Sequence, residues 1–276
     1  MHWQWSHDGV TWKTRVWTGA ASTGPLWLGL HGFTGSGADF APWFTEFSGS
    51  VRWEAPDLPG HGCFDGKTAA SLATMEACRA MLRARVESAD VPVVVVGYSL
   101  GGRVALNFAA QFSHLIDGLV LIGANPGIRD EELRAQRLAW EDELCLRLRR
   151  DGLAGFLRYW QSLPIIATQS CIPEPIWALM QERRLQGSAD GLEQSIRGMG
   201  TGNMVSIWDE LGNIECPVLY CAGQEDLKYC RVGQEVASSV PHGQFVAVPG
   251  AGHAAHLEEM VSSGEIVSRW YRSVSD

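Results

Sequence analysis

The sequence has no long hydrophobic run. Its longest strongly apolar stretch extends from Val91 to Val96, whereas a helix that crosses a bilayer needs about 20 apolar residues. The N-terminal segment from Met1 to Asp8 has neither a basic start nor an apolar core, so it lacks the pattern of a signal peptide. We therefore expect a cytoplasmic protein without membrane insertion.

Cysteine pairs are also missing. The seven cysteines are odd in number and include no C-x-x-C pair, and no His/Cys cluster has zinc spacing. No glycine-rich dinucleotide fingerprint occurs. We expect reduced thiols, with Cys63 and Cys221 only packing against their neighbours. We also expect no metal ion and no other cofactor.

The chain has little positive charge. Its 22 Lys and Arg residues face 31 Asp and Glu residues, which gives a net charge of -9. This balance argues against a nucleic-acid surface as the main binding site. The 276 residues are 46% hydrophobic, which is enough for one large α/β domain, or for one domain with an insertion.

Short apolar runs alternate with helical patterns along most of the chain. Such alternation predicts a mostly parallel sheet with helices on both faces. An N-terminal antiparallel pair is expected at 3–5 and 11–17, where polar and apolar residues alternate. Further strands are expected at 26–30, 51–55, 92–97, 119–123, 217–223 and 244–248, with helices at 71–86 and 101–112.

No strand pattern occurs between Pro126 and about Met204. Helices are expected there at 130–149, 153–163, 173–185 and 192–199. We therefore divide the chain into a core, 1–125 and 205–276, and a helical cap, 126–204. Residues 126–200 contain ten arginines and eleven acidic residues, so most of the negative charge lies in the core. The cap arginines either pair on exposed helix surfaces or face an anionic substrate, and both interpretations stay open.

Gly97-Tyr98-Ser99-Leu100-Gly101 matches the G-x-S-x-G pattern between an expected strand and an expected helix. A tight turn of this kind exposes the serine hydroxyl at the carboxyl edge of the sheet. The N–H of Leu100 would then point from the helix N-terminus towards developing negative charge. Ser99 is thus a candidate nucleophile or base.

A reactive serine needs a base and an acid that orients the base. His253 follows the last expected strand, and Asp226 follows the strand before it. The order Ser, Asp, His is that of an α/β-hydrolase triad. Glu225 is a weaker alternative to Asp226, and we expect His256 to begin a helix rather than act as a second base.

His31-Gly32-Phe33 follows the first buried strand. The N–H of Phe33 can supply a second oxyanion donor, whereas His31 is expected to be structural. Asp57 and His61 lie in a segment, 57–62, that has the pattern of a turn. We therefore favour a structural role for both of them over a catalytic one.

Several segments resemble the α/β-hydrolases in general: 30–35, 57–62, 97–102 and 251–253. Others resemble the 2-succinyl-6-hydroxy-2,4-cyclohexadiene-1-carboxylate synthase family of the menaquinone pathway. These more specific segments are Gly97–Arg103, Asn125–Gly127 with Arg134 and Arg137, Arg158–Pro164, Gly198–Asn203 with Trp208, and Glu225–Tyr229. The resemblance extends from Leu26 to Trp270. It implies an α/β-hydrolase fold with a mostly parallel central sheet and an inserted helical cap.

The resemblance also implies a cofactor-free carbon–oxygen lyase that eliminates pyruvate in menaquinone or phylloquinone synthesis. Its small substrate carries several carboxylates, which suit guanidinium groups. Substrate contacts are implied for Tyr98, Arg103, Arg134, Trp160, Arg184 and Lys228, with Arg137 as an alternative to Arg134. The segment Cys63-Phe64-Asp65 departs from the small polar residues common there. The rival functions are a carboxylesterase or C–C hydrolase with the same triad, and a non-catalytic ligand-binding protein.

Overall fold

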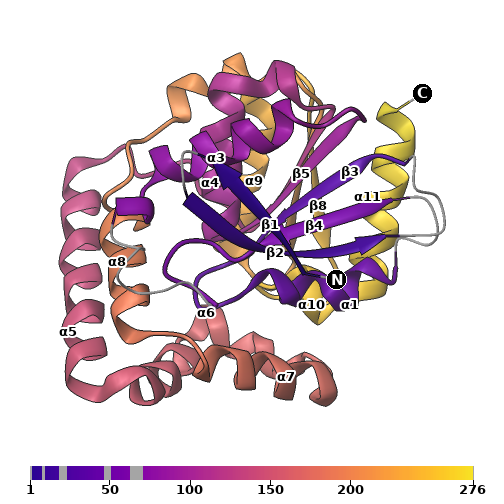
Figure 1. Ribbon diagram of the computed structural model, residues 1–276. Helices are drawn as coiled ribbons and strands as arrows, with labels where there is room; N and C mark the ends of the chain where they lie inside the picture. Colours follow the sequence, from indigo (N-terminus) through magenta and orange to yellow (C-terminus); the bar gives the residue numbers. More distant parts are fainter. Residues whose placement is uncertain (1, 8–9, 19–23, 47–50, 63–70, 276) are drawn as a thin grey trace.

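The computed structural model describes residues 2–7, 10–18, 24–46, 51–62 and 71–275. Eight strands form one sheet in the order β1-β2-β4-β3-β5-β6-β7-β8 (Figure 1). The strands are β1 (His2–His7), β2 (Val10–Thr18), β3 (Leu26–Leu30), β4 (Arg52–Pro56), β5 (Val93–Tyr98), β6 (Gly118–Ile122), β7 (Val218–Gly223) and β8 (Gly243–Val248). The predicted Cys63 packing and the departure at 63–65 lie outside the described residues.

All neighbouring strands from β4 to β8 are parallel. The two N-terminal strands form the predicted antiparallel pair, in which Trp5 lies opposite Trp12. β2 then pairs antiparallel with β4, so that β1 becomes one edge of the sheet. Parallel strands place their carboxyl ends at one edge, and in this fold that edge carries the site described below.

The central strand β5 shows why its sequence is continuously apolar. Val93 and Val95 pack in one core cluster with helices α3 (Met75–Glu87) and α4 (Leu100–Phe112). Val94 and Val96 pack in a second cluster with α11 (Met260–Val274). Successive side chains of a strand point to opposite faces, so a strand covered on both faces needs no polar alternation.

Helices cover both faces of the sheet. The remaining core helices are α1 (Ala41–Phe44), α9 (Leu227–Ser239) and α10 (Ala255–Glu258), with short 3₁₀ turns at Gly37–Phe40, Ser113–Leu115 and Trp208–Asn213. The helix predicted from residue 71 begins instead at Met75. Thr74 is extended, and its Oγ1 accepts a hydrogen bond from Ala77 N at 3.1 Å, which fixes the helix start.

Between β6 and β7 the chain forms helices and turns only, and all residues from 126 to 204 are described. The helices are α5 (Glu131–Ser162), α6 (Pro164–Ala167), α7 (Glu174–Leu185) and α8 (Ala189–Met199), with a 3₁₀ turn at Thr168–Cys171. They lie to one side of the sheet (Figure 1). Gly152 interrupts α5 with φ 65°, which matches the predicted boundary between two helices.

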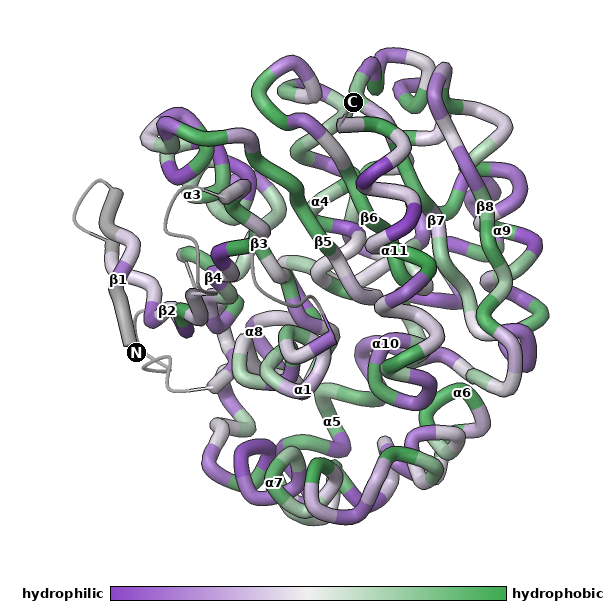
Figure 2. Tube along the Cα trace, turned by 90° about the vertical axis from the view of Figure 1, so that its right-hand side faces the viewer, coloured by the Kyte–Doolittle hydropathy of each residue, from purple (hydrophilic) through white to green (hydrophobic). Residues whose placement is uncertain are grey.

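The cap helices have a core of their own. Leu144, Leu148 and Phe156 of α5 pack against Leu192 and Ile196 of α8. Hydropathy alternates along α7, whereas the central strands are mostly hydrophobic (Figure 2). No helix among the described residues is long and apolar enough to span a membrane.

His256 lies on the short helix α10, between β8 and α11, and is almost fully buried. Its ring contacts those of Phe40, Trp43 and Tyr98, at centroid distances of 4.6 to 5.8 Å. Burial lowers the pKa of His256 to about 3, and the nearby His253 acts in the same direction. The folded state therefore favours the neutral ring.

This burial predicts a pH-dependent stability. An unfolded histidine titrates near ~6.5, so the stabilisation is present above that pH and declines as the pH falls towards the lower folded value. His256→Phe should therefore reduce the fall in melting temperature between about pH 7 and pH 5. Exposed His242→Phe is the control and should leave the slope unchanged. Equal slopes for wild type and His256→Phe would contradict the prediction.

Candidate active site

Ser99 lies at a sharp turn between β5 and α4. Its backbone has φ 50° and ψ -104°, a conformation that non-glycine residues rarely adopt. The flanking glycines allow this turn: a Cβ on Gly97 would lie 2.5 Å from Gly102 Cα, and one on Gly101 would lie 2.0 Å from Leu30 O. The G-x-S-x-G pattern therefore reflects close backbone contacts on both sides of the serine.

Loops after β7 and β8 bring two further side chains to Ser99. His253 Nε2 lies 3.0 Å from Ser99 Oγ, and His253 Nδ1 lies 2.7 Å from Asp226 Oδ2. Asp226 Oδ1 also accepts a hydrogen bond from Tyr229 N at 3.2 Å. Because a carboxylate faces Nδ1, that nitrogen carries the ring proton and Nε2 is left to accept one from Ser99. Glu225 is exposed, and no hydrogen bond joins it to His253.

The predicted oxyanion donors lie beside this triad. Phe33 and Leu100 line the same cavity as Ser99 and His253. The hydrogen bond from Gly101 N to His31 O, at 3.0 Å, holds the Phe33 loop against the first turn of α4. Helix N-termini leave their first N–H groups available for a ligand. Two backbone donors can thus face an oxygen bound near Ser99.

The other polar residues of the early loops are structural in this fold. His31 Nε2 accepts a hydrogen bond from Leu58 N at 2.9 Å. Asp57 Oδ1 accepts one from Gly37 N, also at 2.9 Å, and His61 Nδ1 faces Pro59 O at 3.1 Å. These bonds tie the 57–62 turn to the loop after β3. Cys221 is buried in the core, as predicted.

The cavity next to the triad has a volume of about 380 Å³. Tryptophan and aliphatic side chains form much of its wall, including Trp140, Trp160, Leu144, Leu163, Ile165, Ile166 and Ile196. Its charged side chains, apart from His253, are Arg103, Arg137, Lys228 and Glu141. Three cations therefore face the space with one carboxylate, which suits an anionic ligand with an apolar body.

The predicted substrate contacts divide into two groups. Arg103, Trp160 and Lys228 line the cavity, and so does Arg137, the alternative to Arg134. Arg134 does not line it, because its Nε donates to Gly202 O at 2.8 Å. The structure therefore favours Arg137 over Arg134.

Tyr98 and Arg184 lie outside the cavity wall, in a buried chain of hydrogen bonds. Arg184 Nη2 donates to Gln169 Oε1 at 2.8 Å, and Gln169 Nε2 donates to Tyr98 OH at 3.3 Å. Arg184 also lies over the Trp177 ring at 5.2 Å. A substrate contact of these two residues stays a prediction.

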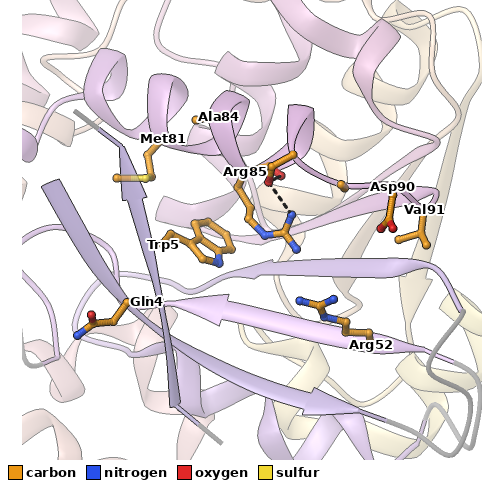
Figure 3. A pocket seen from close by; sticks show the side chains of 10 residues that line it. Gln4, Trp5, Arg52, Met81, Ala84, Arg85, Asp90 and Val91 are labelled. Atoms are coloured by element: carbon orange, nitrogen blue, oxygen red, sulfur yellow. Dashed lines mark hydrogen bonds between the residues drawn. The ribbon is translucent and has the colours of Figure 1, made fainter. Parts of the chain in front are cut away.

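A second cavity of about 320 Å³ lies between β1 and α3, where Trp5, Met81 and Arg85 face one another (Figure 3). Its arginines are already paired, because buried Glu54 binds both Arg52 and Arg85. The wall of the cavity beside Ser99 therefore has an excess of positive charge, which the wall of this second cavity lacks. Among the described residues, no group of three or more His, Cys, Asp or Glu side chains could hold a metal ion.

Comparison with known proteins shows the family of the chain. The profile of the alpha/beta hydrolase family matches residues 28–262. The chain belongs to this family. The predicted fold class, an α/β-hydrolase fold with a mostly parallel sheet flanked by helices, is thus confirmed.

Two curated relatives carry one enzyme name. A putative 2-succinyl-6-hydroxy-2,4-cyclohexadiene-1-carboxylate synthase of Bacillus subtilis is 32% identical over 89% of this chain and 89% of its own length. A synthase of the same name from Salmonella heidelberg is 30% identical over 85% of this chain and 88% of its own. The solved structure of MenH from S. aureus has a TM-score of 0.84 at 24% identity, and covers 95% of this chain and 99% of that one. The resemblance to this synthase family is thus confirmed.

Glu141, Trp140 and Ser195 line the cavity but are absent from the sequence-based prediction. A signal for Glu141 existed, because it follows Arg137 by four residues on one helix. Ser195 and the apolar wall had no local signal, since they face the cavity only through the packing of α8 against α5.

Proposed function

We propose that the chain eliminates pyruvate from 2-succinyl-5-enolpyruvyl-6-hydroxy-3-cyclohexene-1-carboxylate and releases 2-succinyl-6-hydroxy-2,4-cyclohexadiene-1-carboxylate, in menaquinone or phylloquinone synthesis. The relatives that carry this synthase name match most of the chain. The observation that carries the proposal is the cavity itself: the Ser99–His253 pair opens onto a space with three cations and one carboxylate. A small substrate with several carboxylates fits such a wall. We also propose that the protein is cytoplasmic, as the sequence predicts.

The proposed chemistry uses the triad as a base. His253 Nε2 takes the Ser99 Oγ proton, and the serine oxygen removes a proton from a substrate ring carbon. The proton comes from C2, and the electron pair of that C–H bond forms the C2=C3 double bond. The electron pair of the existing C3=C4 double bond moves to form C4=C5, and the C–O bond between C5 and the enolpyruvyl group breaks. Enolpyruvate leaves with the electron pair of that bond and becomes pyruvate after protonation. The N–H groups of Phe33 and Leu100 stabilise developing negative charge on oxygen.

The rival function is a carboxylesterase or C–C hydrolase with the same triad. Such reactions of neutral acyl groups do not need three cations in the wall. Purified protein is incubated with the cyclohexene substrate, and pyruvate is followed with lactate dehydrogenase. Stoichiometric pyruvate with formation of the conjugated diene supports the lyase. Absence of pyruvate, with hydrolysis of neutral p-nitrophenyl esters, supports the rival.

Two arginines of α5 provide a matched test of substrate binding. Arg137→Met should lower kcat/KM, with a loss of transition-state stabilisation of about 2–4 kcal/mol. The reason is that a substrate carboxylate would lose its partner in a partly desolvated wall. Arg134→Met should change kcat/KM by less than about threefold, because Arg134 binds Gly202 O outside the cavity. Steady-state kinetics of both variants show which of the two arginines contacts the substrate. A larger loss for Arg134→Met would reverse the assignment.

A further inference from the structure

We propose that Glu141 is a positioning residue for substrate recognition: its buried carboxylate holds Arg137 and the Gly200–Gly202 turn so that Arg137 presents its terminal nitrogens to the substrate. This inference rests on the proposed function for the identity of the substrate. Glu141 is an acidic residue in the wall of a cavity whose other charged residues, apart from His253, are cations.

Glu141 lies on α5 with only 3% of its surface exposed, although it borders the cavity. Its Oε1 accepts a hydrogen bond from Arg137 Nε at 2.6 Å. Both of its carboxylate oxygens also face Gly202 N, at 3.3 and 3.2 Å. A buried carboxylate is costly unless it is paired and hydrogen-bonded, and Glu141 satisfies both conditions with one side chain and one backbone group.

The contact with Nε fixes the guanidinium group of Arg137. Glu141 uses Nε, while Trp140 packs against the same guanidinium with its ring centroid 4.5 Å from Cζ. Within the described part of the chain, no hydrogen bond engages Nη1 or Nη2 of Arg137. These two nitrogens form the edge with which arginine binds a carboxylate in a bidentate manner. Glu141 therefore orients the group without occupying the edge that a substrate needs.

The Gly200–Gly202 turn is shaped around the same carboxylate. A Cβ on Gly200 would lie 2.4 Å from Glu141 Oε2, and one on Gly202 would lie 3.1 Å from it. Just before the turn, Met199 O accepts a hydrogen bond from Arg103 Nη2 at 2.8 Å. Glu141 thus connects α5 to the segment that also holds Arg103, so two of the three cations share one support.

The electrostatics of the wall agree with this role. The pKa of Arg103 is lowered to about 10, mainly by burial; the charge of Arg137 acts in the same direction, whereas Tyr229 and Glu141 act in the opposite one. The pKa of Lys228 is also lowered, first by burial and then by Arg137. Arg137 therefore repels both Arg103 and Lys228, and Glu141 offsets part of this repulsion at Arg103.

Glu141→Gln separates positioning from simple charge. The amide keeps the size of the side chain and can still accept from Gly202 N, but it loses the ionic contact with Arg137. Positioning predicts about a tenfold increase in KM with kcat within about threefold, because the lost interaction is made with bound substrate and transition state alike. A carboxylate that only repels the anionic substrate would instead give a lower KM, and that result would overturn the proposal.

Glu143→Gln is the matched control. Glu143 lies on the same helix, is about half exposed, and pairs with Arg147 four residues away at 3.7 Å. Its replacement should leave KM and kcat unchanged within about twofold. Melting temperatures of both variants are measured alongside. An equal rise in KM for the two variants would show a general effect of helix charge and would refute the role of Glu141.

A double-mutant cycle tests whether Glu141 acts through Arg137. In the Arg137→Met background, Glu141→Gln should add less than about twofold to KM, since the group that it positions is gone. A further tenfold increase in that background would mean that Glu141 acts independently, and the proposal would fail. A structural role alone would lower the melting temperature without this non-additivity.

The four proteins of this cycle are the wild type, Glu141→Gln, Arg137→Met and the double variant. Each is titrated calorimetrically with 2-succinylbenzoate, a stable aromatic dicarboxylate. The expected pattern is about a tenfold weaker Kd for Glu141→Gln, with no additional loss in the double variant. If the wild type releases no pyruvate but the binding pattern holds, the proposed reaction is wrong and the role of Glu141 stands. If the wild type does not bind the dicarboxylate, the inference about Glu141 is overturned.

Discussion

Ser99→Ala is expected to lower kcat by about 10⁴-fold or more, since loss of a triad serine removes the group through which the base acts. In the proposed reaction Ser99 Oγ takes the ring proton, and His253 acts through Ser99 by accepting the serine proton. Some residual rate should remain from the oxyanion donors and from substrate binding. The measurement is pyruvate release at saturating substrate.

The same substitution should leave stability nearly unchanged. The hydrogen bond to His253 Nε2 is a contact of the reacting atoms, not one that closes the turn. The turn depends on Gly97 and Gly101, and alanine keeps the same backbone strain as serine. Exposed Ser162→Ala is the control for both assays. A Ser99→Ala enzyme that keeps more than about a tenth of the wild-type kcat would contradict the role of Ser99.

The sheet and the triad could be predicted because their signals are local. The strand Val93–Tyr98 is buried on both faces, so its apolar run is continuous and ends at Gly97. Parallel strands deliver the residues that follow them to one edge, and this rule alone brings Ser99, Asp226 and His253 together. The antiparallel N-terminal pair could also be predicted, because polar and apolar residues alternate at 3–5 and 11–17.

The cap side chains could not be placed in this way. Arg134 and Arg137 are three residues apart on α5, and either can face the core, depending on how the helix is rotated about its axis. That rotation is set by the contacts of Leu144 and Leu148 with Leu192 and Ile196 of α8. These partners are more than 40 residues away in the sequence, so no local pattern encodes the choice. The burial of Arg184 beside Gln169 has the same origin in long-range packing.

Asp226→Asn should lower kcat/KM by about 10⁴-fold, an effect as large as that seen when a triad acid is neutralised elsewhere. The expected cause is the tautomer of His253. Tyr229 N donates to Asp226 Oδ1 and His253 Nδ1 lies against Oδ2. An asparagine would keep its oxygen on Tyr229 N and turn its NH₂ towards His253. The ring would then carry its proton on Nε2, where it cannot accept the proton of Ser99.

Glu225→Gln is the matched control, because it changes the neighbouring carboxylate in the same manner and Glu225 is exposed. It should alter kcat/KM by less than about twofold. Pyruvate release by the two variants is compared at equal, subsaturating substrate, with circular dichroism to show that both are folded. A severe loss in Glu225→Gln together with a mild one in Asp226→Asn would make Glu225 the acid of the triad. The hydrogen bond of 2.7 Å between His253 and Asp226 predicts the opposite order.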